Sequence, residues 1–311
     1  MQRRVRVMPP VATPSFRLSP QGQRAVMAVL WLAALVGTLI GLGALRLHLV
    51  ADPLADVRAY YDAGARLNAG LPLYAQAAGT DDAGFYRYPP LLAIAFRPLA
   101  LLPFETAALI WEAVLIVATL VTLYRIGLGR RTWLVLGMLA MPILWTLAIG
   151  QAQALVTMLL AFGSPFGVAL AGHIKLTPWL AGVYWVGRRD GRALVRLAGW
   201  IGALAVLQLV LAPQATLDFV SFPSLTQVGD VANLSPYAVS PLLWGAFLVA
   251  GLAAAWRLAP TRWGWVAAVS LAVFASPRLL AYQLSSLLAG LGGPRDAAPA
   301  PASGHAEPQS P

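Results

Sequence analysis

The sequence predicts an all-α protein that crosses a membrane several times, and three observations support this prediction. Apolar residues make up 59% of the 311 residues and charged residues only 11%, and the mean hydropathy is +0.70. A water-soluble protein of this length needs far more charge to cover its surface. The apolar residues also gather in long runs with few charges, and a chain inside lipid must satisfy its backbone hydrogen bonds internally, as a helix does.

The first apolar run, residues 25–45, carries no charge between Arg24 and Arg46. About 20 residues of helix cross a hydrocarbon core about 30 Å thick. The run is longer than the core of a signal peptide, and no small-residue cleavage site follows it. We therefore expect a retained transmembrane helix, preceded by a basic cytoplasmic segment over residues 1–24.

The next segment, residues 49–88, is expected to be an external loop, and it combines carboxylates with aromatic rings. It holds five of the twelve acidic residues and five tyrosines: Asp52, Asp56, Asp62, Asp81, Asp82, Tyr60, Tyr61, Tyr74, Tyr86 and Tyr88. Such a loop above an apolar bundle favours chemistry on a polar group presented at the membrane surface.

Nine further apolar runs predict the rest of a membrane domain over residues 25–292, with about 8–10 apolar helices in all. They lie near 89–103, 104–124, 132–149, 150–163, 165–186, 193–212, 241–257, 263–277 and 279–292. Runs of about 14 residues reach only about 21 Å as helix, so some are expected to be re-entrant or interfacial. A second external loop is expected over 213–240, and residues 293–311, rich in Pro and Ala, are expected to be a disordered tail.

The charge distribution predicts the topology. The net charge of +10 comes mainly from arginines grouped beside the apolar runs, a pattern typical of an inner-membrane protein with these groups inside, not of a nucleic-acid-binding face. The N-terminus and the turn at 187–196 are therefore expected on the cytoplasmic side, with an odd number of crossings between 89 and 186. Basic residues at 125–131 favour three crossings, with 89–103 and 150–163 as partial insertions, although five also satisfy the rule. The chain has no cysteine, and its three scattered histidines indicate no metal site.

Two ionisable residues are the main candidates for chemistry. Asp56 lies early in the first external loop, where a carboxylate can accept a proton from a sugar hydroxyl; the alternative is a solvated or helix-capping acid. Lys175 is the only lysine of the chain and interrupts an apolar run. An ionisable residue inside an apolar run costs free energy, so such a residue is a functional candidate by default. An ammonium group can bind a lipid-linked phosphate. The alternatives are snorkelling to the interface or pairing with Glu112.

Other polar residues interrupt the apolar runs, namely Arg97, Glu112, Gln151, Gln153, Tyr282 and Gln283. Each alone is explained by a hydrogen bond between helices, worth about 1 kcal/mol. Together they predict a bundle with a polar interior. The aromatic residues of the first loop can belong to an interfacial belt or stack on a sugar.

Several motifs resemble glycosyltransferase family 87, a bacterial family of GT-C membrane enzymes formerly described as a domain of unknown function. The similar segments are DVRAYYDAGARLNAGLPLY, which begins at Asp56, then YPPLLAIAFRPLALLPFETAALIW, GQAQALVTMLL, AGHIKLTPWL, which contains Lys175, and SPRLLAYQLSSLL. Two positions depart from the family pattern: Gln153 replaces a common asparagine, and Gln283 stands where an acid is expected. The interval from Gln151 to Lys175 is short, and the chain resembles a shortened member.

The resemblance implies a GT-C fold and a hexosyl transfer, with mannose as the expected sugar. A polyprenyl-phosphate sugar is the implied donor, a glycolipid or glycan hydroxyl is the acceptor, and the transfer inverts the anomeric carbon without a cofactor. Asp56 is the implied base, and Lys175, Arg58 and Arg87 are implied to hold the phosphate. We further expect substrate binding by Tyr60, Tyr61, Tyr88, Gln151 and Tyr282.

Two other functions stay open on the residues alone. A transporter or flippase could line its path with Lys175, Glu112 and the glutamines, but transporters often show repeated halves, and the halves of this chain do not resemble each other. A non-catalytic, truncated GT-C-like membrane subunit is the other alternative.

Overall fold

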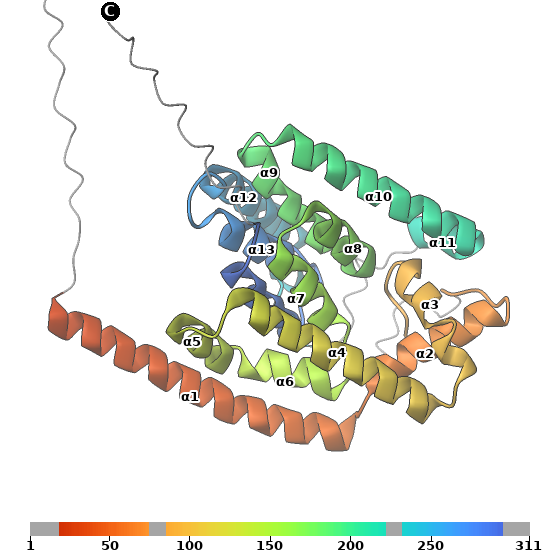
Figure 1. The fold of residues 1–311 in the computed structure, drawn as a ribbon, viewed down its shortest axis with the longest axis horizontal. Coiled ribbons are helices and arrows are strands. Elements are labelled where there is room, and N and C mark those ends of the chain that lie inside the picture. Colours follow the sequence, from red (N-terminus) through yellow and green to blue (C-terminus); the bar gives the residue numbers. More distant parts are fainter. Residues whose placement is uncertain (1–18, 75–84, 222–231, 295–311) are drawn as a thin grey trace, which may run out of the picture.

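The computed structural model describes residues 19–74, 85–221 and 232–294. All but the first two residues of the expected disordered tail, most of the basic N-terminal segment, Asp81, Asp82 and the middle of the second loop lie outside these described residues. Within them, every regular element is a helix, so the predicted all-α bundle is confirmed for this part of the chain (Figure 1).

Four helices are long and apolar enough to cross a bilayer: α1 (Pro20–Ala51), α4 (Phe104–Ile126), α10 (Gly191–Leu211) and α12 (Pro241–Leu258). Two further helices, α5 (Arg130–Met138) and α6 (Ala140–Ala148), form a pair bent by 63° that could count as a fifth span. Most side chains of the four long helices are exposed, as expected for surfaces that face lipid. These helices match the first, third, fourth, seventh and eighth predicted apolar runs.

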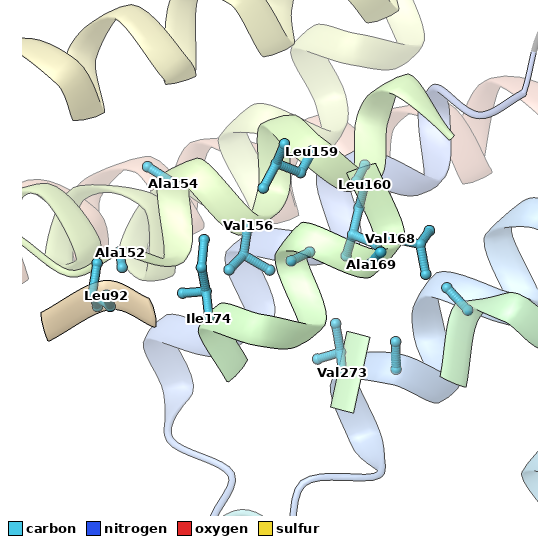
Figure 2. Close-up of a cluster of buried hydrophobic side chains, with 14 of the residues drawn as sticks. Leu92, Ala152, Ala154, Val156, Leu159, Leu160, Val168, Ala169, Ile174 and Val273 are labelled. Atoms are coloured by element: carbon cyan, nitrogen blue, oxygen red, sulfur yellow. The ribbon is translucent and has the colours of Figure 1, made fainter. Parts of the chain in front are cut away.

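Shorter helices fill the space between the long ones. In Figure 1, α1 and α4 lie along one side and α10 along the other, with α7 (Gln153–Phe162), α8 (Pro165–Lys175) and α13 (Gly264–Phe274) between them. The 3-10 helix η4 (Ala281–Leu291) packs against α7 and α13. Figure 2 shows side chains of these inner helices, among them Val156, Val168 and Val273, gathered in the core. The inner helices therefore meet side chains instead of lipid.

The first helix packs closely on the bent pair because glycines line the contact. A side chain at Gly37 would collide with the backbone of Gly137, and one at Gly41 would collide with Ala140. Two glycines four residues apart lie on one helix face and let backbones approach, as in other helix pairs inside membranes. This contact fixes the C-terminal end of α1 beside the end of α6.

The predicted run 165–186 is not one helix, which differs from the expected single crossing. It divides into α8, the 3-10 helix η2 (Thr177–Gly182) and α9 (Val183–Gly187). Pro178 lacks a backbone N–H and disfavours helical geometry at the residue before it. The break falls at Leu176, which takes a left-handed φ of 30°, so Lys175 becomes the last residue of α8.

Both segments expected as external loops contain helices. The first holds α2 (Ala55–Asn68), and the second begins with α11 (Pro213–Ser221) and ends with η3 (Pro236–Ala238). The run at 89–103 forms only α3 (Pro90–Phe96) and η1 (Leu99–Leu101), which are too short to cross a bilayer.

Candidate active site

Asp56 lies in the first turn of α2, and backbone hydrogen bonds fasten this turn to the end of α6. The Leu54 N–H donates to the Ala148 carbonyl at 3.2 Å, and the Asp56 N–H donates to the Ile149 carbonyl at 3.0 Å. Leu54 itself is left-handed, with φ 57°, a conformation that costs about 1–2 kcal/mol for a residue other than glycine. The position of Asp56 is therefore set by α6 as well as by its own helix.

A cavity of about 280 Å³ opens beside Asp56. Of the residues that the sequence singled out for the site, it is lined by Asp56, Arg87, Tyr88, Lys175 and Tyr282. These five residues come from four separate parts of the chain: α2, the segment before α3, the end of α8, and η4. The fold thus brings the predicted base and two of the three predicted phosphate ligands, Arg87 and Lys175, into one space.

The Lys175 ammonium reaches this cavity from the end of α8. Its Nζ atom is buried and makes no hydrogen bond within the described part of the chain. It lies 5.2 Å from the ring centroid of Tyr88 and 4.8 Å from that of Tyr282, so two aromatic faces stabilise the charge. The described structure shows no ion pair between Lys175 and Glu112, which was one of the alternatives for this lysine.

Burial raises the pKa of Asp56 from 3.8 to about 6. Lys175 and Arg278, together with a hydrogen bond from Gln151, act in the opposite direction and favour the carboxylate. At pH 7 Asp56 is mainly ionised but more basic than an exposed aspartate. A pKa near the working pH is what an efficient general base requires.

Gln151 and Tyr60 lie behind the cavity wall and support the residues that line it. The Tyr60 hydroxyl donates to Gln151 Oε1 at 2.6 Å, and Gln151 Nε2 donates to the Tyr88 hydroxyl at 3.0 Å. Tyr60 is fully buried and packs edge-on against Phe96 and Trp111. These two predicted substrate-binding residues therefore orient Asp56 and Tyr88 and do not line the cavity.

A second buried network holds the segment of Tyr88 next to that of Lys175. Gln208 of α10 accepts from the Leu91 N–H at 2.9 Å and donates to His173 Nδ1 at 2.7 Å. Because both ends of the amide are engaged, His173 is the neutral tautomer whose Nε2–H donates to the Ile201 carbonyl at 3.1 Å. His173 therefore has a structural part in the site.

Arg58 and Tyr61 are not brought into the cavity. The Arg58 guanidinium lies 3.4 Å over the ring centroid of Phe104, and the Tyr61 hydroxyl donates to the Leu102 carbonyl at 2.8 Å. Helical residues two positions apart point about 200° away from each other. Since residue 58 follows Asp56 by two positions in α2, its side chain points to the outer face of the bundle.

Arg278 is a cavity residue that the sequence did not single out. It lies in the segment between α13 and η4, inside one of the motifs that resemble the family. The signal that could have identified it is the one that identified Lys175, a single charge between two apolar runs. Its guanidinium adds a second cation to the neighbourhood of Asp56.

The chemistry available in this cavity is proton transfer and binding of an anion. Asp56 supplies a base, while Arg87, Lys175 and Arg278 supply positive charge. Among the described residues, no three His, Cys, Asp or Glu side chains gather as a metal site would require.

The profile of glycosyltransferase family 87 matches residues 85–291, a range that includes Arg87, Lys175 and Arg278 but not Asp56. No solved structure matches the chain.

Three curated relatives are similar over part of their length. A polyprenol-phosphate-mannose-dependent alpha-(1-2)-phosphatidylinositol pentamannoside mannosyltransferase of Mycolicibacterium smegmatis is 30% identical over 174 residues, which are 50% of this chain and 41% of the relative. The protein of the same name from Mycobacterium tuberculosis is 27% identical over 213 residues, 60% and 47% of the two chains. A phosphatidylinositol mannoside mannosyltransferase of M. smegmatis is 28% identical over 66% of this chain and 55% of its own. The chain spans about half the length of the curated relatives it matches.

Proposed function

Because the chain belongs to glycosyltransferase family 87, we propose that it is a membrane glycosyltransferase that moves a hexose from a polyprenyl-phosphate donor to a hydroxyl of a glycolipid or glycan. The names of the relatives favour mannose as the sugar. The observation that carries the proposal is that Asp56, Lys175 and Arg278 line one shared cavity. The arginine distribution favours the cell membrane, with the N-terminus cytoplasmic and α2 external.

The cations of the cavity hold the donor phosphate and stabilise it as a leaving group. When the bond between the anomeric carbon and the phosphate oxygen breaks, negative charge grows on the phosphate. We expect Lys175 and Arg278 to stabilise that charge, and cationic groups that are already fixed in position do so at little reorganisation cost. The buried, unbonded Nζ of Lys175 gains a hydrogen-bond partner when a phosphate oxygen arrives, which removes much of the cost of its burial.

Asp56 is the base of the transfer. Its carboxylate accepts the proton of the acceptor hydroxyl while the hydroxyl oxygen attacks the anomeric carbon from the side opposite the phosphate. The new glycosidic bond forms as the old bond breaks, so the configuration inverts. The products are the glycoside and polyprenyl phosphate, and the proton leaves Asp56 for water through the cavity.

The test is transfer of radiolabelled mannose from synthetic polyprenyl-phosphate-mannose to extracted membrane glycolipids. Wild type is compared with Asp56→Asn and with Asp62→Asn, which changes an exposed acid of the same helix outside the cavity. We expect wild type and Asp62→Asn to transfer the sugar and Asp56→Asn to lose activity by at least about 100-fold, the usual range for a general base.

Near-normal turnover by Asp56→Asn would remove Asp56 as the base. No transfer by wild-type protein that is well folded, with mannose and with other hexoses as the donor sugar, would reject the enzyme and favour a transporter or a non-catalytic subunit.

A further inference from the structure

A second carboxylate, Asp52, lines the same cavity, and the transfer described above does not use it. Asp52 follows the last residue of α1, and its N–H donates to the His48 carbonyl at 3.3 Å. Its side chain is 42% exposed. A carboxylate at the C-terminal end of a helix faces the negative end of the helix dipole. The dipole of α1 therefore does not favour an acid here, and some other interaction keeps it in place.

Asp52 is oriented from behind by an imidazole. His48 Nδ1 donates to Asp52 Oδ1 at 2.7 Å, and the His48 ring stacks on the Trp145 ring with centroids 4.5 Å apart and planes 11° from parallel. Trp145 lines the cavity and meets the edge of Tyr282, with the two ring centroids 5.6 Å apart. Only one carboxylate oxygen is used by His48, so Asp52 keeps hydrogen-bond acceptor capacity on the side of the cavity.

The charged residues of the cavity favour two different kinds of ligand. Arg87, Lys175 and Arg278 attract a phosphate, whereas Asp52 repels one. An ionised carboxylate only accepts hydrogen bonds, so its suitable ligand is a neutral group with hydroxyl donors. In a glycosyl transfer from a lipid phosphate, that ligand is the acceptor sugar.

We propose that Asp52, oriented by His48, binds a hydroxyl of the acceptor sugar and so places the attacking hydroxyl at Asp56. This proposal rests on the proposed function. Asp52 contacts the substrate, and His48 is a positioning residue. The end of α1 suits a lipid-borne acceptor, because Leu47, Leu49 and Val50 in its last two turns are exposed apolar side chains. A sugar attached to a lipid beside α1 reaches the cavity where this helix ends.

The test measures binding apart from catalysis, on the purified full-length protein in detergent. The two probes are radiolabelled octyl α-mannoside for the acceptor side and a synthetic polyprenyl phosphate for the donor side. We expect Asp52→Ala to weaken mannoside binding about ten- to hundredfold, as expected for loss of a hydrogen bond to a charged group. Polyprenyl phosphate binding should stay within about twofold of wild type or improve, because a negative charge has been removed. Asp62→Asn, the control on α2, should change neither affinity.

A second pair of variants tests the role of His48. His48→Leu removes the donor to Asp52 and should weaken mannoside binding. His48→Asn keeps an N–H near the position of Nδ1 and should restore most of the affinity. If His48 has only a structural role, the two variants should weaken mannoside binding to a similar extent. Each variant should then also lower the affinity for polyprenyl phosphate.

Three results would overturn the proposal: no measurable mannoside binding by wild type, unchanged mannoside binding by Asp52→Ala, or equal weakening of both probes. The sugar-transfer assay tests the proposed function separately, because Asp56→Asn can abolish transfer whether or not Asp52 binds the acceptor. If Asp52→Ala only shifts the pH at which transfer is half-maximal and leaves mannoside binding intact, Asp52 acts on the charge of Asp56 and the proposal fails.

Discussion

Replacing Asp56 by asparagine is expected to make the protein more stable at neutral pH while removing its activity. Burial raises the pKa of Asp56 from 3.8 to about 6, so the folded protein holds this proton more tightly than the unfolded chain does. Each pKa unit corresponds to about 1.4 kcal/mol, and the shift of about two units gives at most about 3 kcal/mol. This is the cost of ionising Asp56 inside the fold.

The sign of the effect follows from linkage. Because the folded-state pKa is raised, the stability linked to the bound proton is fully present below pH 3.8 and is lost as the pH rises through 6. Asparagine has nearly the same shape as a protonated aspartate and carries no charge at any pH. Asp56→Asn should therefore match wild type near pH 4 and exceed it in stability at pH 8.

The assay is thermal unfolding of the purified protein in detergent at pH 4 and at pH 8. We expect the Tm of Asp56→Asn to be several degrees above that of wild type at pH 8 and nearly equal to it at pH 4. Asp62→Asn serves as the control, because it removes an exposed carboxylate of the same helix that lies outside the cavity. A Tm below that of wild type at pH 8, or the same difference at both pH values, would refute the reasoning.

Three other changes test the cavity and its support. Lys175→Ala should raise the KM for the donor at least about tenfold and leave the acceptor KM within about twofold, since one phosphate contact is lost; equal donor affinity would contradict the phosphate role. Arg278→Gln should also raise the KM for the donor, whereas Arg58→Gln, which changes an arginine outside the cavity, should leave it unchanged. Similar donor KM values for the two variants would remove Arg278 from the site. Gly150→Ala should lower the unfolding free energy by about 2 kcal/mol or more, because its φ of 69° suits glycine and a side chain would collide with Val57; an unchanged Tm in thermal unfolding would contradict this packing.

The rate of sugar transfer should depend on the same ionisation of Asp56. The rate should fall below about pH 6, where Asp56 becomes protonated, instead of near pH 4 as for an ordinary aspartate. At pH 5 about one tenth of the Asp56 carboxyls remain ionised if the pKa is about 6, so about a tenth of the rate should remain. A flat profile between pH 5 and pH 7 would show that another group controls the step.

The long helices could be predicted from the sequence because lipid surroundings strongly favour apolar residues. A segment that crosses lipid has few ways to satisfy its backbone hydrogen bonds, so an apolar run of sufficient length with few charges nearly always becomes a helix. This holds for α1, α4, α10 and α12. It fails for run 165–186, because composition alone does not outweigh the local effect of Pro178.

The two main candidates were also visible in the sequence, for a related reason. An ionisable residue costs free energy near lipid, so Asp56 and Lys175 stand out against apolar surroundings. The sequence analysis assigned no helix to the first loop and so gave no basis for separating the side chains that face the cavity from those that do not. In a helix, Tyr60 follows Asp56 by one turn and faces inward, whereas Arg58 and Tyr61 point outward.

Composition and local order were enough to predict the class of protein, the positions of the long helices and the rare charges in an apolar chain. The folded structure was needed to see that Asp56, Lys175 and Arg278 share one cavity, because more than 200 positions separate the first from the last. It also decided that His48 orients Asp52 while stacking on Trp145. Contacts between distant segments depend on how helices pack, and one sequence carries no direct signal of that packing.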